Sequence, residues 1–230
     1  MTGWPRLLVL VRHAESARNV VKGGEAFLPD GTPPSAQARL ADHLVPLTAA
    51  GHEHARRTGE AIRDRFGAFD AVCSSGYARA DQTAAGIAAA YLAAGLDFPA
   101  PVISPLLRER DAGYCYGMTR AEAVAAFPWL DEHWRQAGGF FGKPPGGESM
   151  ADVVGRAQAF LGVLGGEQAG RTVLAVTHGG TIRALRFLLE RWDYATAEQA
   201  IRDGAPANCG LAVYRYGDGA MRLEEFNRVY

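Results

Sequence analysis

Short runs of apolar residues alternate with longer amphipathic or alanine-rich segments along most of the chain. Residues 7–11 read LLVLV and residues 172–177 read TVLAVT. Runs of this length and β-branched content are typical of strands that are buried on both faces of a sheet. The same reasoning predicts further short strands at residues 69–73, 101–103, 211–215 and 221–226.

The segments between these strands predict helices with recognisable ends. Thr48, Thr119 and Ser149 each suit the N-cap position, and Glu122 completes a capping box with Thr119. Gly95 suits the end of an alanine-rich helix. We therefore expect helices over residues 48–66, 79–94, 119–127, 149–164 and 178–189.

The order of these elements indicates the fold class. Strands that alternate with helices favour an α/β protein with a mostly parallel sheet, covered by helices on both faces. No internal repeat or low-complexity linker divides the 230 residues, so we expect one domain over residues 1–230. Residues 23–46 are polar and carry Gly, Pro, Asp and Ser, and we interpret them as a long surface insertion with room for one helical turn.

Composition and charge narrow the classes of function. Hydrophobic residues make up 48% and charged residues 21% of the chain, and the formal net charge is −1. This ordinary balance argues against a general affinity for nucleic acid or acidic lipid. The three cysteines are far apart and odd in number, which fits a reducing compartment. The apolar run at 7–11 is too short for a signal peptide or a membrane span. We expect a soluble cytoplasmic protein with no nucleic-acid or membrane partner.

Residues suited to phosphate chemistry follow three of the predicted strands. Arg12 and His13 follow the first strand, Arg79 lies shortly after the second, and His178 follows residues 172–177. Ligands of parallel sheets bind outside the carboxyl ends of the strands, so neighbouring strands would gather these side chains in one pocket. A neutral imidazole can attack phosphorus, while guanidinium groups and a second, protonated histidine bind its oxygens. A carboxylic acid would then protonate the leaving alkoxide.

The segment CSSGYAR, residues 73–79, offers a second interpretation of Arg79. The phosphate-binding loop of cysteine-dependent phosphatases has a cysteine and an arginine at this spacing, and its thiol needs a lowered pKa. That interpretation leaves Arg12, His13 and His178 without a role. We favour the histidine-based site and expect Cys73 to be a small buried residue.

Six segments resemble motifs of the histidine phosphatase superfamily, the group that includes cofactor-dependent phosphoglycerate mutase and many phosphatases. LVRHAESARN resembles the nucleophile motif, with Ala14 where the superfamily usually has glycine. The matches occur in the family's order and span residue 8 to about residue 189. The other five matching segments are LTAAG, SSGYARADQTA, LRERDAGYCYG, PPGGESMADV and VTHGG.

The resemblance implies a three-layer α/β/α sandwich, phosphoglycerate mutase-like, with one antiparallel strand, and it assigns a role to each matched residue. His13 is the nucleophile and Glu109 the proton donor, and Arg12, Arg79 and His178 complete the catalytic set. Asn19 equally suits the cap of a turn. The residues implied to bind the substrate are Arg12, Ser16, Asn19, Arg79, His178 and Gly179.

The step that follows the phosphohistidine separates two branches of the superfamily. Glycolytic mutases carry Trp two residues after the Ser of the nucleophile motif, where this chain has Arg18, and a Gly-Trp shortly beyond, which is missing here. We therefore favour a phosphatase acting on small phosphate monoesters. A mutase acting within a sugar acid phosphate and a non-catalytic phospho-ligand binding protein are the alternatives. We predict no metal site and no cofactor.

Residues 118–148 are the segment that we expect to cover the pocket. Four aromatic residues between Pro128 and Pro145 either offer an apolar surface to the substrate or pack a helix against the sheet. The sequence leaves the oligomeric state open and is compatible with a dimer. The four residues are Trp129, Trp134, Phe140 and Phe141.

Overall fold

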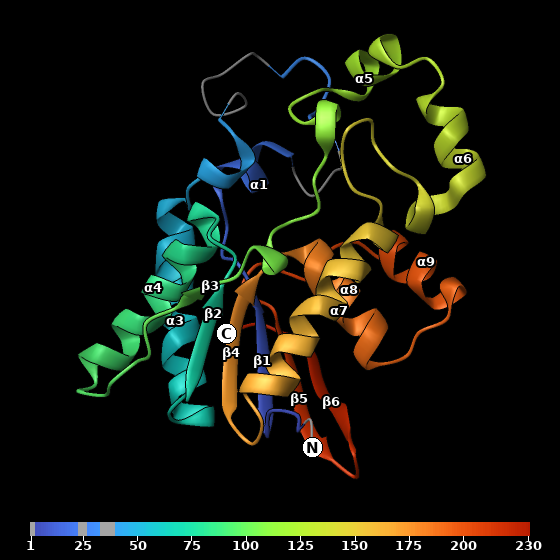
Figure 1. Ribbon diagram of the computed structural model, residues 1–230. Helices are drawn as coiled ribbons and strands as arrows, with labels where there is room; N and C mark the ends of the chain where they lie inside the picture. Colours follow the sequence, from blue (N-terminus) through green and yellow to red (C-terminus); the bar gives the residue numbers. More distant parts are fainter. Residues whose placement is uncertain (1–2, 23–26, 33–39) are drawn as a thin grey trace.

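A computed structural model describes residues 3–22, 27–32 and 40–230 of the chain (Figure 1). The predicted insertion at 23–46 therefore lies partly outside the described residues. Its described parts include the single 3₁₀ turn η1 (Asp42–Leu44). The backbone N–H of Leu28 donates to the Met118 carbonyl (3.0 Å), which ties residues 27–32 to the start of the segment of residues 118–148.

The six strands of the described chain form one sheet in the order β3-β2-β4-β1-β5-β6. The strand β5 runs in the direction opposite to the other five, so the predicted mostly parallel sheet with one antiparallel strand is confirmed. The register places Arg12 beside Thr177, and the residues that follow β1 and β4 therefore meet at one edge. The strands are β1 (Leu7–Arg12), β2 (Ala71–Ser74), β3 (Val102–Ile103), β4 (Thr172–Thr177), β5 (Leu211–Gly217) and β6 (Ala220–Arg228).

Side chains of the central strands alternate between two hydrophobic cores. Leu8 and Leu10 of β1 join the core under α7 and α8, whereas Leu7 and Val9 join the core under α3 and α4. Both faces of β1 are buried, which is why its sequence is continuously apolar. The predicted three layers are confirmed, with α3 and α4 on one side of the sheet and α7 and α8 on the other (Figure 1). These helices are α3 (Ala49–Phe66), α4 (Ala78–Ala93), α7 (Met150–Glu167) and α8 (Gly179–Leu189).

The predicted helix starts are confirmed by their caps. The Thr48 side chain accepts a hydrogen bond from the Gly51 N–H (2.9 Å). Thr119 and Ser149 both form complete capping boxes, at α5 (Arg120–Ala126) and α7. Gly95 has φ +70° beyond α4, as expected of a helix-ending glycine. The helix α7, expected to end at about residue 164, continues to Glu167.

Three α-helices of the described chain were not predicted, and the shortest of them is α1 (Ala17–Lys22). The helix α6 (Leu130–Phe141) begins without a side-chain cap and contains Gly138 at φ 71°, so neither its start nor its interior has a helical signature. The helix α9 (Tyr194–Arg202) does have a cap, since the Asp193 side chain accepts from the Thr196 N–H (2.8 Å). Among its residues only Ala197 is buried, which leaves little apolar periodicity to recognise.

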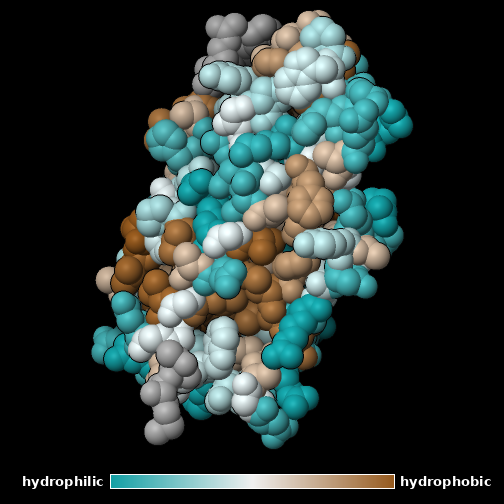
Figure 2. Space-filling model, turned by 45° about the vertical axis from the view of Figure 1, so that its right-hand side comes forward, coloured by the Kyte–Doolittle hydropathy of each residue, from teal (hydrophilic) through white to brown (hydrophobic). Residues whose placement is uncertain are grey.

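The helices α5 and α6 rise above the carboxyl ends of the strands (Figure 1). We call residues 118–148 the cap. Figure 2 shows mostly hydrophilic side chains at the height of the cap and a gathering of hydrophobic ones lower down. Within the cap, Phe140 is buried against Phe187 (ring centroids 5.1 Å apart) and Trp134 packs against Phe27 (5.6 Å). These two aromatic residues therefore serve packing, as one of the two interpretations expected.

No helix in the described ranges has the length and apolar character needed to cross a membrane.

Candidate active site

His13 lies directly beyond β1 and is almost fully buried, with 3% of its surface exposed. Its Nδ1 lies 2.7 Å from the carbonyl oxygen of Ala14. A carbonyl oxygen only accepts hydrogen bonds, so Nδ1 carries the proton and Nε2 keeps its lone pair. Burial lowers the pKa of His13 well below 6.5, and the charges of Arg79 and Arg12 lower it further. The geometry and the charges therefore both favour a neutral ring with Nε2 as a nucleophile.

His178 faces His13 from the turn between β4 and α8, with ring centroids 5.1 Å apart. Its Nε2 lies 2.8 Å from Oγ of Ser75, while Nδ1 is buried and has no partner among the described residues. Burial lowers the pKa of His178 well below 6.5, and the charges of Arg79 and His13 lower it further. Burial and these neighbouring charges thus favour a neutral His178 rather than the protonated one expected from the sequence.

The guanidinium of Arg12 is held by a segment close to the end of the chain. Its Nη1 donates to the carbonyl of Pro206, and its Nε is buried without a partner among the described residues. The side chain of Asn208 donates to the carbonyl of His13 (2.9 Å), and the Cys209 N–H donates to that of Arg12 (3.1 Å). Residues 206–209 therefore fix the backbone that carries both Arg12 and His13.

Arg79 is buried at the first turn of α4, and its guanidinium forms hydrogen bonds with Asp42 of η1. Its Nη1 donates to the Asp42 carbonyl (2.5 Å) and to Oδ1 (3.1 Å), and its Nη2 donates to Oδ2 (3.2 Å). A guanidinium has five N–H groups, so Asp42 uses three of them. The remaining pair, on Nε and Nη2, lies along the other edge of the fork and suits two phosphoryl oxygens.

Glu109 lies on a loop that is pinned to the start of α8. The side chains of Thr177 and Thr181 donate to the carbonyls of Leu107 (2.7 Å) and Arg108 (2.6 Å). Oε1 of Glu109 accepts from the Gly180 N–H (3.1 Å). A Cβ on Gly180 would lie 2.5 Å from that oxygen, so glycine is needed for this approach. Gly180 is two residues after His178, so this hydrogen bond holds the Glu109 carboxyl group at the same turn as that histidine.

The glutamate of the Gly-Glu-Ser motif secures the same loop from the other side. Oε1 of Glu148 accepts from Arg108 (2.6 Å) and from Arg156 of α7 (3.0 Å), and Oε2 accepts from the Asp111 N–H (3.0 Å). Arg156 also donates to the Leu106 carbonyl (2.9 Å). Glu148 therefore connects α7 to both ends of the loop that carries Glu109.

Ser16 and Asn19 form a turn at the start of α1 (Ala17–Lys22). The Ser16 N–H and hydroxyl both donate to Oδ1 of Asn19 (3.0 and 2.8 Å), and Asn208 approaches the same oxygen (3.3 Å). Oδ1 of Asn19 thus caps the turn, and only its amino group is left for a substrate. Gly179 lies against Arg12, because a Cβ on it would be 3.7 Å from Nε.

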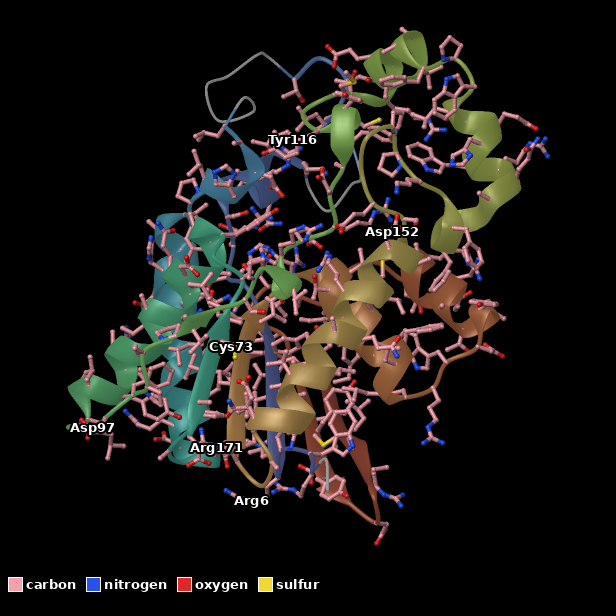
Figure 3. All side chains as sticks on the ribbon, viewed as in Figure 1. Arg6, Cys73, Asp97, Tyr116, Asp152 and Arg171 are labelled. Carbon is pink, nitrogen blue, oxygen red and sulfur yellow. The ribbon has the colours of Figure 1, made fainter. Side chains whose placement is uncertain are left out.

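Cys73 lies in β2 and packs against the core under α7 and α8. Figure 3 labels it within the sheet, below the edge where the strands end. Burial raises the pKa of its thiol to about 11. A cysteine nucleophile needs the opposite shift, so the geometry supports the histidine-based interpretation.

The model of the histidine phosphatase superfamily (branch 1) matches residues 8–229. The chain belongs to this superfamily. Among curated histidine phosphatase relatives, 2,3-bisphosphoglycerate-dependent phosphoglycerate mutase of Methylobacterium radiotolerans is 33% identical over 209 residues, 87% of each chain. The mutase of the same name from Azorhizobium caulinodans is 30% identical over 224 residues, 96% of this chain and 97% of that protein.

Solved protein structures are also similar to this chain. A mycobacterial glucosyl-3-phosphoglycerate phosphatase, solved with VO3, is 26% identical with a TM-score of 0.69, over 96% of this chain and 99% of that one. YhfR of Bacillus stearothermophilus has a TM-score of 0.74 at 23% identity, over 97% and 98% of the two chains, and shows the fold alone. The superfamily relatives thus include both phosphatases and mutases.

Three residues that complete the histidine phosphatase pocket were not assigned a role from the sequence. Ser75 lies inside the matched SSGYAR segment, so its motif was the available signal. Asp42 lies in the predicted insertion and Asn208 in a connection without a motif, and neither had a local signal. Both act through contacts with residues far away in the sequence.

Proposed function

We propose that this chain is a phosphatase that hydrolyses phosphate monoesters through a phosphohistidine on His13. The observation that carries the proposal is the hydrogen bond from Nδ1 of His13 to the Ala14 carbonyl, which leaves Nε2 unprotonated in a pocket that also holds His178. The lowered pKa of His13, caused by burial and two arginines, supports the neutral form that attack requires.

In the proposed complex, the phosphoryl group lies between the two arginines and the two histidines. Arg79 offers Nε and Nη2 on the edge that Asp42 does not use, and Arg12 offers its unpartnered Nε. Nδ1 of His178 completes the ring of donors when Ser75 donates its hydroxyl proton to Nε2. These charge-assisted contacts neutralise the charge that develops on the nonbridging oxygens.

The reaction proceeds in two displacements. Nε2 of His13 forms a bond to phosphorus while the ester P–O bond breaks, and the Glu109 carboxyl group gives its proton to the leaving alkoxide. A water molecule then forms a P–O bond as the P–N bond breaks, and Glu109 takes a proton from that water. Inorganic phosphate leaves, and His13 and Glu109 return to their starting states.

Phosphoryl transfer of the mutase type is the second candidate, because the curated relatives at 30–33% identity are mutases. Two features of this chain support hydrolysis instead. Arg18 stands where the glycolytic mutases have tryptophan, and Asp111-Ala112 replaces their His-Tyr after the Glu-Arg pair. A mutase must also keep water away from its phosphohistidine.

The test is to trap the intermediate. Incubation with a ³²P-labelled monoester, followed by rapid quenching in alkali, should leave an alkali-stable, acid-labile label on the chain. We expect the label and the hydrolysis of p-nitrophenyl phosphate to disappear in His13→Ala and to persist in Cys73→Ser. A label that survives in His13→Ala would overturn the proposal. Conversion of 3-phosphoglycerate to 2-phosphoglycerate faster than its hydrolysis would assign the chain to the mutases.

A further inference from the structure

Two basic side chains beside the pocket have no part in the proposed phosphoryl transfer. Arg18 and Lys22 lie four residues apart on α1, so they project from the same face of the helix. Both are partly buried, and burial is the main cause that lowers the pKa of each, that of Lys22 to about 8. Like charges at this spacing destabilise a helix by a few tenths of a kcal/mol.

Within the described ranges, no carboxylate forms an ion pair with Arg18 or Lys22. Nη1 of Arg18 is buried without a hydrogen-bond partner among the same residues. The nearby carboxylate of Asp42 is already engaged by Arg79. Buried cations are normally paired, so this arrangement requires an explanation.

Arg18 is nevertheless held in a defined position. Its guanidinium stacks on the ring of Tyr116, 3.8 Å from the ring centroid. The hydroxyl of Tyr116 donates to the Leu40 carbonyl (2.8 Å), which fixes the ring behind the guanidinium. Figure 3 labels Tyr116 close to α1, at the height of the cap. A guanidinium stacked on a ring keeps its edge free for an oxygen ligand.

The two cations lie next to the phosphoryl pocket. Arg18 is close enough to Asp42 and Arg79 for their charges to act on it, and Lys22 is close enough to Asp42 and Glu109. The helix α1 begins directly after the turn of Ser16 and Asn19 that follows His13. The face with Arg18 and Lys22 therefore lies near both Arg79 and the proposed proton donor Glu109.

We propose that Arg18 and Lys22 bind a second anionic group of the substrate, a carboxylate or a second phosphoryl group, while the reacting phosphoryl group lies on His13. The inference rests on the proposed function and specifies its substrate class. A guanidinium forms two parallel hydrogen bonds with two oxygens of such a group. A lysine ammonium adds a positive charge whose interaction depends less on orientation. The anion offsets the like-charge pair that α1 otherwise carries alone.

The test compares linear alkyl phosphates of three to six carbons that end in a hydroxyl, a carboxylate or a second phosphate, at pH 7, where Lys22 is mostly charged. For the chain length that spans the two sites, we expect kcat/KM at least about tenfold higher with an anionic end than with a hydroxyl end. The carboxylate and phosphate arms identify which anion is preferred. In Arg18→Gln or Lys22→Gln, that preference should fall at least fivefold, chiefly through KM.

Arg222→Gln is the matched control, since Arg222 is an exposed arginine on β6, and the preference should be unchanged in it. Thermal unfolding of each variant shows that it is folded, and the two variants test the subsite independently. Equal kcat/KM for all three ends, or a preference that survives in both variants, would overturn this inference and leave the phosphatase proposal standing. Hydrolysis of none of the compounds would overturn the proposed function itself.

Discussion

Asp42 determines which edge of the Arg79 guanidinium is left free for the proposed phosphoryl group. Its carboxylate and its carbonyl hold three N–H groups of the guanidinium, so the unused edge has a fixed direction. A clamp that is already oriented loses less side-chain entropy when the phosphoryl group binds. Asp42 is therefore a positioning residue in the proposed reaction, although it stands 37 residues from Arg79 in the sequence.

We expect Asp42→Asn to lower kcat/KM for p-nitrophenyl phosphate about tenfold, because loss of one charged, oriented partner typically costs ~1.5 kcal/mol. Inorganic phosphate should inhibit this variant more weakly than the wild type. Asp64→Asn removes an exposed carboxylate paired with Arg63 and serves as the control. Tighter phosphate binding in Asp42→Asn would mean that Asp42 competes with the ligand instead of orienting its clamp.

The two buried histidines make stability depend on pH. Burial lowers the pKa of both His13 and His178 in the folded chain, so the unfolded chain binds more protons below its ordinary histidine pKa of about 6.5. Above that pH the two histidines do not reduce the free energy of unfolding. As the pH falls below it, the free energy of unfolding decreases by up to about 1.4 kcal/mol per pH unit for each histidine.

Urea unfolding between pH 7 and pH 5 measures this effect. We expect His178→Gln to lose less stability than the wild type over that range, and His52→Gln, which changes an exposed residue of α3, to follow the wild type. Parallel curves for the wild type and His178→Gln would show that His178 does not remain neutral in the folded chain.

At the scale of elements, the loop of residues 106–111 has no regular structure of its own beyond one 3₁₀ turn, η2 (Pro105–Leu107). Its position depends on Glu148 at one side and on Thr177 and Thr181 at the other. The Glu109 carboxyl group is only as well placed as these contacts allow. This dependence links the start of α7 to the proposed proton transfer.

Glu148→Gln should therefore affect both stability and turnover. The buried guanidinium of Arg156 loses its ionic partner, so we expect the free energy of unfolding in urea to fall by roughly 3 kcal/mol. We expect kcat to fall at least about tenfold as the loop loosens, since a displacement of ~1 Å can cost two orders of magnitude. Glu132→Gln, which removes an exposed ion pair with Arg135, should leave the free energy of unfolding and kcat equal to those of the wild type within error. An unchanged kcat in Glu148→Gln would show that the remaining contacts position Glu109 alone.

The sequence predicted those elements whose signal is local. The strands β1 and β4 are apolar because both of their faces are buried. Thr48, Thr119 and Ser149 mark the starts of their helices because each side chain forms an N-cap hydrogen bond. The helix α6 has no such signal, because it lacks a cap and is interrupted at Gly138. Its end depends instead on Glu198 of α9, whose carboxylate accepts from the Phe140 N–H (2.6 Å), a contact between residues 58 positions apart.

The candidate site follows the same division. His13 and His178 could be predicted because each follows a recognisable strand and belongs to a motif. Asp42 and Asn208 could not, because their roles exist only once the chain has folded and brought them to Arg79 and His13. A pairing between distant residues leaves no pattern in a single sequence.

At the scale of the whole molecule, the sheet and the cap differ in how well they are buried. Every residue of β4 is buried, whereas α5 has one buried residue, Ala123, and α6 has two. Regions with few buried apolar contacts open locally at a lower free energy than the core. We therefore expect the cap to open locally at a lower free energy than the central sheet.

Hydrogen exchange should separate the two regions. We expect amides of β1 and β4 to exchange only through global unfolding and those of α5 and α6 to exchange at least about 100-fold faster, a difference of roughly 2.7 kcal/mol. Mass spectrometry of peptic fragments measures both in one sample. Equal protection in the sheet and the cap would show that they open as one cooperative unit.

The order of the strands affects how the protein folds during its synthesis. Both hydrogen-bonding neighbours of β1, the strands β4 and β5, begin more than 160 residues after it in the sequence. Arg12 and His13 also depend on contacts with residues 206–209, which are translated more than 190 residues after them. The nascent chain therefore carries its proposed nucleophile long before the residues that complete the pocket around it have been made. Such late, long-range pairing makes folding slow and gives chaperones an unpaired apolar strand to protect.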